Sequence, residues 1–282
     1  MNVPFKHYIA ACQSGRGGIK VKNQITAIIK KDIQGITSNH RMFVTLLAVP
    51  IALTVVVPTL FILIVRFAPS ESADFQKLLA MLPMAEQAEV SSESMVRLVL
   101  NYILPIFFML IPIMASSVMA ACSFVGEKEK RTLETLLYCP LSLKQIFRAK
   151  VLAAFLLSML VSAISFIVML IVLEAETCLF TGFFILPDFK WLLVLLLVAP
   201  AISLIAITLI VKASAKAQSV EDAQQGAVFL IFPIIMLLVG QFTGVLLINA
   251  WVLLALGIVC AFLAILLLKQ SMSHFKYETL LK

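Results

Sequence analysis

Six long apolar runs, separated by polar segments, constrain this 282-residue chain more than any other feature of its sequence. A helix needs about 20 mostly apolar residues to cross about 30 Å of membrane hydrocarbon. The chain is 62% hydrophobic and only 13% charged, a composition that excludes a soluble globular domain. The predicted spans are residues 43–65, 98–122, 151–173, 191–211, 226–248 and 251–268.

We therefore predict an all-α integral membrane protein with six transmembrane helices. The transmembrane domain covers residues 43–268, and an N-terminal amphipathic interfacial helix, or elbow helix, precedes it at 21–42. Residues 1–20 are expected to form a flexible cytoplasmic tail, and residues 269–282 a second cytoplasmic tail.

The elbow helix is predicted from one apolar face. Its apolar residues recur at steps of three and four, which places them on one side of a helix. They are Val21, Ile25, Ile28, Ile29, Ile33 and Ile36. Lysines lie on the other sides, so the pattern favours a helix at the membrane interface, with isoleucines toward the acyl chains. The alternative is a helix that packs on the protein's own loops.

The distribution of charge predicts the orientation. With both termini inside the cell, the cytoplasmic segments hold 18 of the 22 Lys and Arg residues, and the outer segments hold eight of the 15 acidic ones. Lys and Arg concentrate on the cytoplasmic side of membrane proteins. We expect a multi-pass protein of the plasma membrane with both termini in the cytoplasm.

The polar segment between the second and third spans has the most distinctive sequence, GEKEKRTLETLLYCPLSLKQIFRAK at residues 126–150. It begins with alternating charges, becomes amphipathic through three leucines, and is interrupted by a proline before basic residues lead into the next span. This segment resembles the cytoplasmic coupling segment of the ABC type-2 exporter permeases. Arg131 stands where much of that family has Gly, and a basic residue there resembles the branch of sodium-export-like permeases.

The resemblance implies which residues contact a separate ATPase subunit. The implied coupling residues are Gly126, Glu127, Lys128, Glu129, Lys130, Arg131, Thr132, Leu133, Glu134, Leu136, Leu137 and Pro140, and Lys150 also matches the motif. The loop at 212–225 resembles the family's second cytoplasmic loop. Within it, Ser219 followed by Glu221 and Asp222 is typical of a helix start.

The resemblance also implies the composition of a complex. The chain would be the permease subunit of an ATP-driven exporter, with two copies of an ATPase that binds ATP and Mg²⁺. A second permease, identical or related, would complete the membrane pathway, because six spans form one half of such a machine. The cargo stays open among sodium, a drug, a peptide and a lipid.

Residues in the second span are candidates for a pathway or a hinge. They are Asn101, Pro105, Pro112, Ser116 and Ser117. Proline removes a backbone donor and bends a membrane helix, which is compatible with a hinge and equally with ordinary packing.

The sequence carries no catalytic motif, so the chain is not expected to be an enzyme. Its five cysteines have no CxxC spacing, and no metal site is predicted. The alternative function is an ATP-independent channel or a membrane assembly protein, which would lack the ATPase partner.

Overall fold

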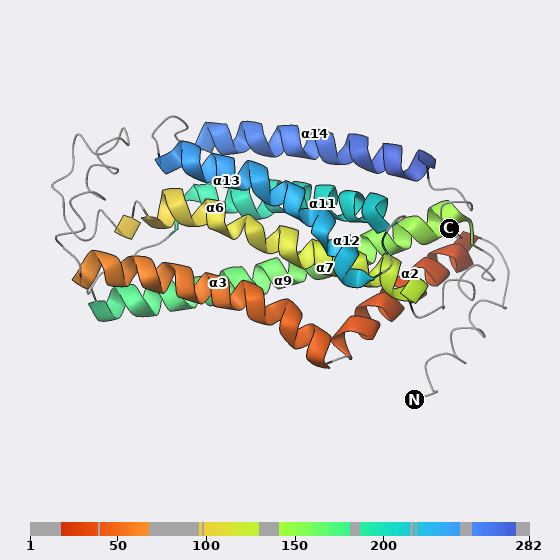
Figure 1. Ribbon diagram of the computed structural model, residues 1–282, viewed down its shortest axis with the longest axis horizontal. Coiled ribbons are helices and arrows are strands. Elements are labelled where there is room, and N and C mark those ends of the chain that lie inside the picture. The colour runs from red at the N-terminus through yellow and green to blue at the C-terminus, as the bar shows by residue number, and fades with distance from the viewer. Residues whose placement is uncertain are drawn as a thin grey trace.

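A computed structural model describes residues 18–38, 40–67, 96–97, 99–129, 141–180, 187–214, 217, 219–242 and 250–274. These residues form an elongated bundle of helices (Figure 1). The elements are α2 Gly18–Thr37, α3 His40–Phe67, η1 Val99–Ile103, α6 Leu104–Phe108, α7 Leu110–Glu129, α9 Leu143–Phe180, α10 Phe189–Leu193, η2 Val194–Val198, α11 Ala199–Ser214, α12 Val220–Gln224, η3 Gln225–Ala227, α13 Val228–Phe242 and α14 Ala250–His274.

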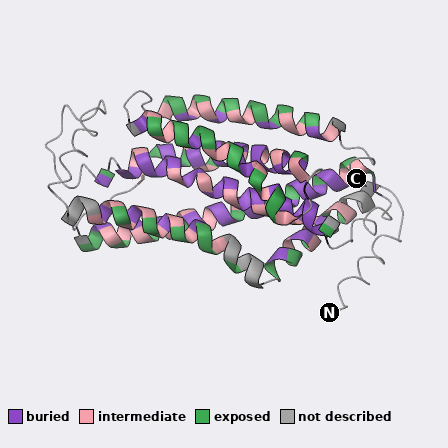
Figure 2. Cartoon of the chain, viewed as in Figure 1, coloured by how far each residue is buried: buried purple, intermediate pink, exposed green. Residues whose placement is uncertain are grey.

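The centre of the bundle consists of α7, α9 and α11, which pack against one another. Figure 2 shows that buried residues concentrate on α7 and α11, whereas exposed ones follow α13, α14 and one side of α9. Aromatic rings close the packing near one end of the bundle, where Trp191 lies between Phe108 and Phe166 with ring centroids 5.6 and 5.5 Å away. The Trp191 indole N–H donates to the backbone oxygen of Leu100 at 3.2 Å, so the polar atom of this ring is also satisfied.

The remaining long helices surround this centre. α3 runs along α9, α14 packs on α11 and η2, and α13 contacts α6 and α7. The approach of α14 is close: a Cβ atom built on Gly257 would lie 2.6 Å from Cδ2 of Leu197. Small residues allow such close contact between membrane helices, which explains a glycine in an otherwise apolar helix.

Two helical stretches are irregular at the same end of the bundle. One of them corresponds to the second predicted span. It begins with the π-helical turn η1, continues as α6, and breaks at Met109, whose N–H lies within hydrogen-bond distance of both Pro105 O and Ile106 O. Pro105 lies in the first turn of α6 and Pro112 in the first turn of α7, positions where a missing N–H leaves few bonds unmade. η2 is a second π-helical turn, directly before α11.

Five helical stretches are long and apolar enough to cross a membrane: Val99–Glu127, Leu143–Leu179, Phe189–Ser214, Val220–Gln241 and Ala250–Met272. α3 adds a shorter apolar stretch, Leu47–Leu63. The structure therefore shows an all-helical multi-pass protein across the described residues, while the number of six spans stays a prediction. The helix at the third predicted span, α9, is longer than that span: it continues beyond 151–173 in both directions.

α2 lies where the amphipathic helix was expected, and it meets α3 at an angle (Figure 1). Its isoleucine face contacts the protein itself. Ile28 is buried together with Leu141, Ile146 and Ala149 at the start of α9, and Ile25 and Ile29 pack against this group. We call this end of the bundle the α2 end, and the opposite one, with η1 and α10, the distal end.

Candidate functional site

Three helices meet at the α2 end: α2 itself, the last turns of α7 and the first turns of α9. Their contact encloses a group of polar side chains, which we call the charge cluster. Its members are Lys31 and Asp32 of α2, Ser123 and Glu127 of α7, and Lys150 of α9.

Glu127 forms ion pairs with two lysines, one from each neighbouring helix. Its Oε1 accepts a hydrogen bond from Nζ of Lys31 at 2.5 Å, and its Oε2 lies 2.7 Å from Nζ of Lys150. Only 8% of Glu127 is exposed to solvent. A single carboxylate therefore joins α2 and α9 through α7.

Lys150 is the most deeply buried charge of the cluster, with 3% of the residue exposed. Besides its pair with Glu127, its ammonium group donates to the backbone oxygen of Ser123. The same group lies 3.9 Å from Oδ2 of Asp32 and 5.5 Å from the centre of the Phe124 ring. Each of these groups supplies negative charge or electron density to the buried cation.

Asp32 completes the cluster by accepting a hydrogen bond from the Ser123 hydroxyl at 2.7 Å. The two lysines and the two acids have opposite charges, so the cluster is formally neutral. Removing one member of a buried ion pair costs about 3–5 kcal/mol, because its partner is left charged in a medium of low dielectric constant. The cluster can therefore hold the three helices in one fixed arrangement.

The side chains of the charge cluster form a structural link between helices. Its one hydroxyl, that of Ser123, is buried and donates to Asp32, and no three His, Cys, Asp or Glu residues in the described part of the chain could hold a metal ion. Its position is informative, since Glu127 lies three residues before 130–140 and Lys150 follows shortly after that segment.

The second cytoplasmic loop predicted from the sequence lies beside the cluster. Ser219 Oγ accepts from the N–H of Asp222 at 3.1 Å, and Asp222 Oδ2 accepts from the N–H of Ser219 at 3.3 Å. This reciprocal arrangement is a capping box, which confirms the predicted helix start. The helix α12 packs on α7, where Val220 Cγ2 would lie 3.9 Å from a Cβ atom built on Gly126, and Glu221 is exposed.

Most of the predicted coupling residues lie outside the described residues: Lys130, Arg131, Thr132, Leu133, Glu134, Leu136, Leu137 and Pro140. Of the others, Gly126 and Glu127 are buried and Glu129 is exposed, while the side chain of Lys128 is not described. Of the predicted tails at 1–20 and 269–282, residues 1–17 and 275–282 lie outside the described residues, whereas 18–20 begin α2 and 269–274 end α14.

The pathway or hinge candidates lie within the protein interior or at its distal end. Ser116 and Ser117 are buried and donate to backbone oxygens of their own helix, Ile113 O and Met114 O. Asn101 accepts a hydrogen bond from the N–H of Asp188 at 3.1 Å and so connects η1 to the start of α10. Their role as a hinge or a pathway stays a prediction.

Sequence reasoning missed Lys31, Asp32 and Ser123 as site residues. A signal was present for one of them. Asp32 falls on the isoleucine face of α2, next to Ile28 and Ile29 in helical spacing, and an acid on an apolar face indicates a buried partner. Nothing in the sequence distinguishes Ser123 from the other serines of α7.

Comparison with known proteins supplies the family. The family model described as ABC-2 type transporter matches residues 23–256, which includes the charge cluster, the segment 130–140 and α12. Neither the search of curated proteins nor the search of solved structures found a match. Because the matched region is most of the chain, the protein belongs to the ABC-2 type transporter family.

Proposed function

We propose that the chain is the permease subunit of an ATP-binding-cassette exporter, driven by a separate ATPase subunit that binds ATP and Mg²⁺. Membership of the ABC-2 type transporter family supports a permease role. The observation that carries the coupling part of the proposal is the charge cluster. It ties α2, α7 and α9 together at the two ends of the segment that resembles the family's coupling segment.

The proposed contact with the ATPase involves residues 126–140. Leu133, Leu136 and Leu137 would fill an apolar notch of the ATPase, while the charges of Glu129, Arg131 and Glu134 fix the register. A displacement of this segment would reach Glu127 at the end of α7 and Leu141 just before α9. Since Glu127 is paired with lysines of α2 and α9, the three helices would move as one unit.

The proposed complex contains two permeases and two ATPase subunits in the plasma membrane, with the α2 end in the cytoplasm. The excess of Lys and Arg in the segments at that end supports this orientation. Closed symmetry is the commonest arrangement of identical subunits, so a twofold dimer of this chain is the simplest assembly.

The test replaces Leu136 and Leu137 together with Asp. Two charges in an apolar notch would cost several kcal/mol, so the variant should lose the ATPase while it still inserts into the membrane. The measurement is ATP hydrolysis by the tagged chain purified in mild detergent from its own cells, together with the amount of co-purified ATPase.

Arg131→Glu is the matched control, since an exposed charge at a rim contributes about 0–1 kcal/mol. It should lower co-purification much less than the double variant does. ATP hydrolysis that survives intact in the double Asp variant would show that 126–140 is not the coupling segment. A wild-type chain that purifies without any ATPase would favour an ATP-independent channel or an assembly protein.

A further inference from the structure

A half-buried acid, Glu176, lies at the distal end, far from the charge cluster. Glu176 of α9 and Thr59 of α3 form a hydrogen bond between the Thr59 hydroxyl and Oε1 of Glu176. This is a direct polar contact between two helices that otherwise pack through apolar side chains. It therefore bears on how α3 and α9 hold together.

The hydrogen bonds of the Thr59 hydroxyl are the first indication of the protonation state of Glu176. Oγ1 of Thr59 also lies 2.7 Å from the backbone oxygen of Val55, one turn earlier in α3. A hydroxyl has one proton to donate, and a backbone oxygen can only accept. If the Thr59 proton serves Val55, the proton between Thr59 and Glu176 must come from Glu176.

The second carboxyl oxygen points to the same conclusion. Oε2 of Glu176 is buried and has no hydrogen-bond partner in the described part of the protein. An ionised carboxylate with one oxygen buried and unpaired is costly, whereas a neutral carboxylic acid avoids most of that cost.

No described lysine or arginine forms an ion pair with Glu176. α3 has one charged residue toward this end, Arg66, whose side chain is not described, and the charge cluster lies at the other end of α7 and α9. The other titratable or charged groups described at the distal end are Glu174 and Cys178 of α9, Arg97, Tyr102, Asp188 and Lys190. Lys190 lies over the ring of Tyr102 and beside Asp188.

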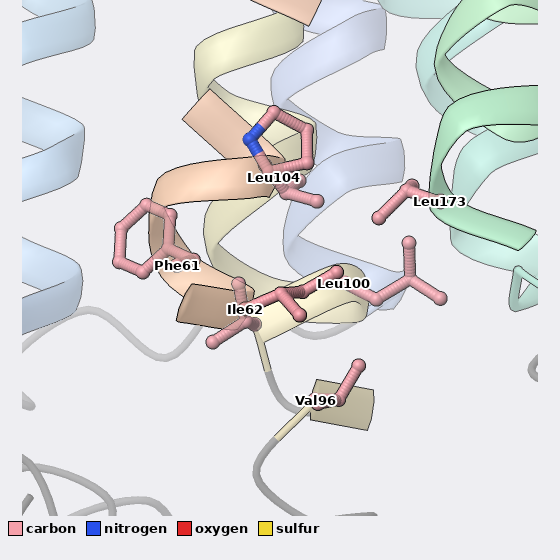
Figure 3. Close-up of a pocket in the computed structure, with 8 residues that line it drawn as sticks. Phe61, Ile62, Val96, Leu100, Leu104 and Leu173 are labelled. Atoms are coloured by element: carbon pink, nitrogen blue, oxygen red, sulfur yellow. The ribbon is translucent and has the colours of Figure 1, made fainter. Parts of the chain in front are cut away.

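The surroundings of the contact are apolar. A small cavity between α3, α9 and η1 is lined by side chains of these elements, including Ile62, Leu100 and Leu173 (Figure 3). Pro58, which precedes Thr59, also lines it, and Leu173 lies one turn before Glu176. Every residue that lines this cavity is apolar, so the cavity offers no solvation to a charge beside it.

We propose that Glu176 is a proton-binding site: it is a neutral carboxylic acid that donates a hydrogen bond to Thr59 and so fastens α3 to α9 at the distal end. Release of the proton to water leaves a carboxylate whose buried oxygen must reach solvent. The two helices then separate beside the apolar cavity. This inference does not depend on the proposed function.

Infrared spectroscopy of the purified full-length chain at neutral pH tests the protonation directly. The carboxylic acid C=O band should be present in the wild type and missing in Glu176→Gln, whereas Glu174→Gln should retain it. Thr59→Val should keep the band but shift its frequency, because the acid loses its acceptor. A band that Glu176→Gln leaves unchanged, or that Thr59→Val does not shift, would overturn the proposal.

Thermal unfolding against pH supplies a second measurement, because Gln mimics the neutral acid. A folded state that binds an extra proton loses stability as pH rises. The Tm of the wild type should therefore fall relative to that of Glu176→Gln as pH is raised. A difference between the two Tm values that does not change with pH would contradict the assignment, whatever the absolute stability of the variant.

Discussion

At the scale of single residues, Glu127 and Glu176 show how surroundings decide what an acid between two helices does. Glu127 has a lysine on each side and is compensated as a carboxylate. Glu176 has one hydroxyl neighbour and an unpaired oxygen, an arrangement that suits a neutral acid. Glu127 holds helices together through ion pairs. Glu176 is proposed to hold two helices together through a hydrogen bond that it donates only while it is protonated.

Lys150→Met tests the charge cluster. The variant keeps most of the apolar volume of the side chain but leaves Glu127 and Asp32 with Lys31 as their remaining cation. We expect a loss of about 3–5 kcal/mol in the free energy of unfolding, measured by denaturant titration in detergent. Lys144→Met is the control, because Lys144 is exposed on the same helix and should change stability by less than about 0.5 kcal/mol.

A double-mutant cycle separates the ion pair from general packing. If Lys150 acts through Glu127, then Glu127→Gln combined with Lys150→Met should cost clearly less than the sum of the two single changes. Strict additivity would mean that the two side chains do not depend on each other.

At the scale of elements, α2 shows why an apolar face does not reveal its own partner. The spacing of isoleucines predicted a helix, and a helix is present at Gly18–Thr37. The same pattern suits a lipid interface or a protein surface equally well. The structure places Ile28 against Ile146 and Ala149 of α9, so much of the face is covered by the protein itself.

Ile28→Ala should loosen α2 from α9. Truncating a buried Ile to Ala costs about 2–5 kcal/mol, and here the loss falls on one peripheral contact. Hydrogen exchange of the α2 amides should become at least about tenfold faster, as seen by mass spectrometry. Gln34→Ala, at an exposed position of the same helix, should leave exchange unchanged. Equal protection in both variants would show that the α2 contact does not depend on Ile28.

Elements that follow from one-dimensional patterns were predictable, and those that depend on distant contacts were not. The apolar runs predicted helices long enough to cross a membrane, because the thickness of the bilayer sets the length of such helices. Ser219 with Asp222 gave a helix start because capping is local. The π-helical turns left no such pattern, whereas the break at Met109 lies between the two prolines of the second predicted span. The pairing of Lys31 with Glu127 joins residues 96 positions apart, so it required the fold.

At the scale of the whole molecule, burial divides the bundle into an inner and an outer set of helices. Residues of α7 and α11 are mostly buried, whereas large apolar side chains such as Phe229 and Phe232 of α13 and Phe262 of α14 are exposed. Such a surface is unfavourable in water and suits acyl chains or another apolar protein surface.

Single cysteines test the proposed orientation. In a chain without its five native cysteines, Asp188→Cys at the distal end should react with an impermeant thiol reagent in intact cells. Glu221→Cys at the α2 end should react only after the membrane is opened. Both positions are exposed, so access to the reagent depends on the side of the membrane. The opposite pattern would place the α2 end outside the cell and refute the charge-based orientation.

The packing of the two tryptophans makes the chain its own fluorescent reporter. Trp191 is 1% exposed, within the aromatic group of Phe108 and Phe166, whereas Trp251 is 77% exposed on α14. Lipids with brominated acyl chains should quench the emission of Trp251 and spare that of Trp191. In a Trp251→Phe variant, a single indole would remain at the junction of α6, α9 and α10. Its emission wavelength would then register any separation of these helices during a transport cycle, without an attached dye.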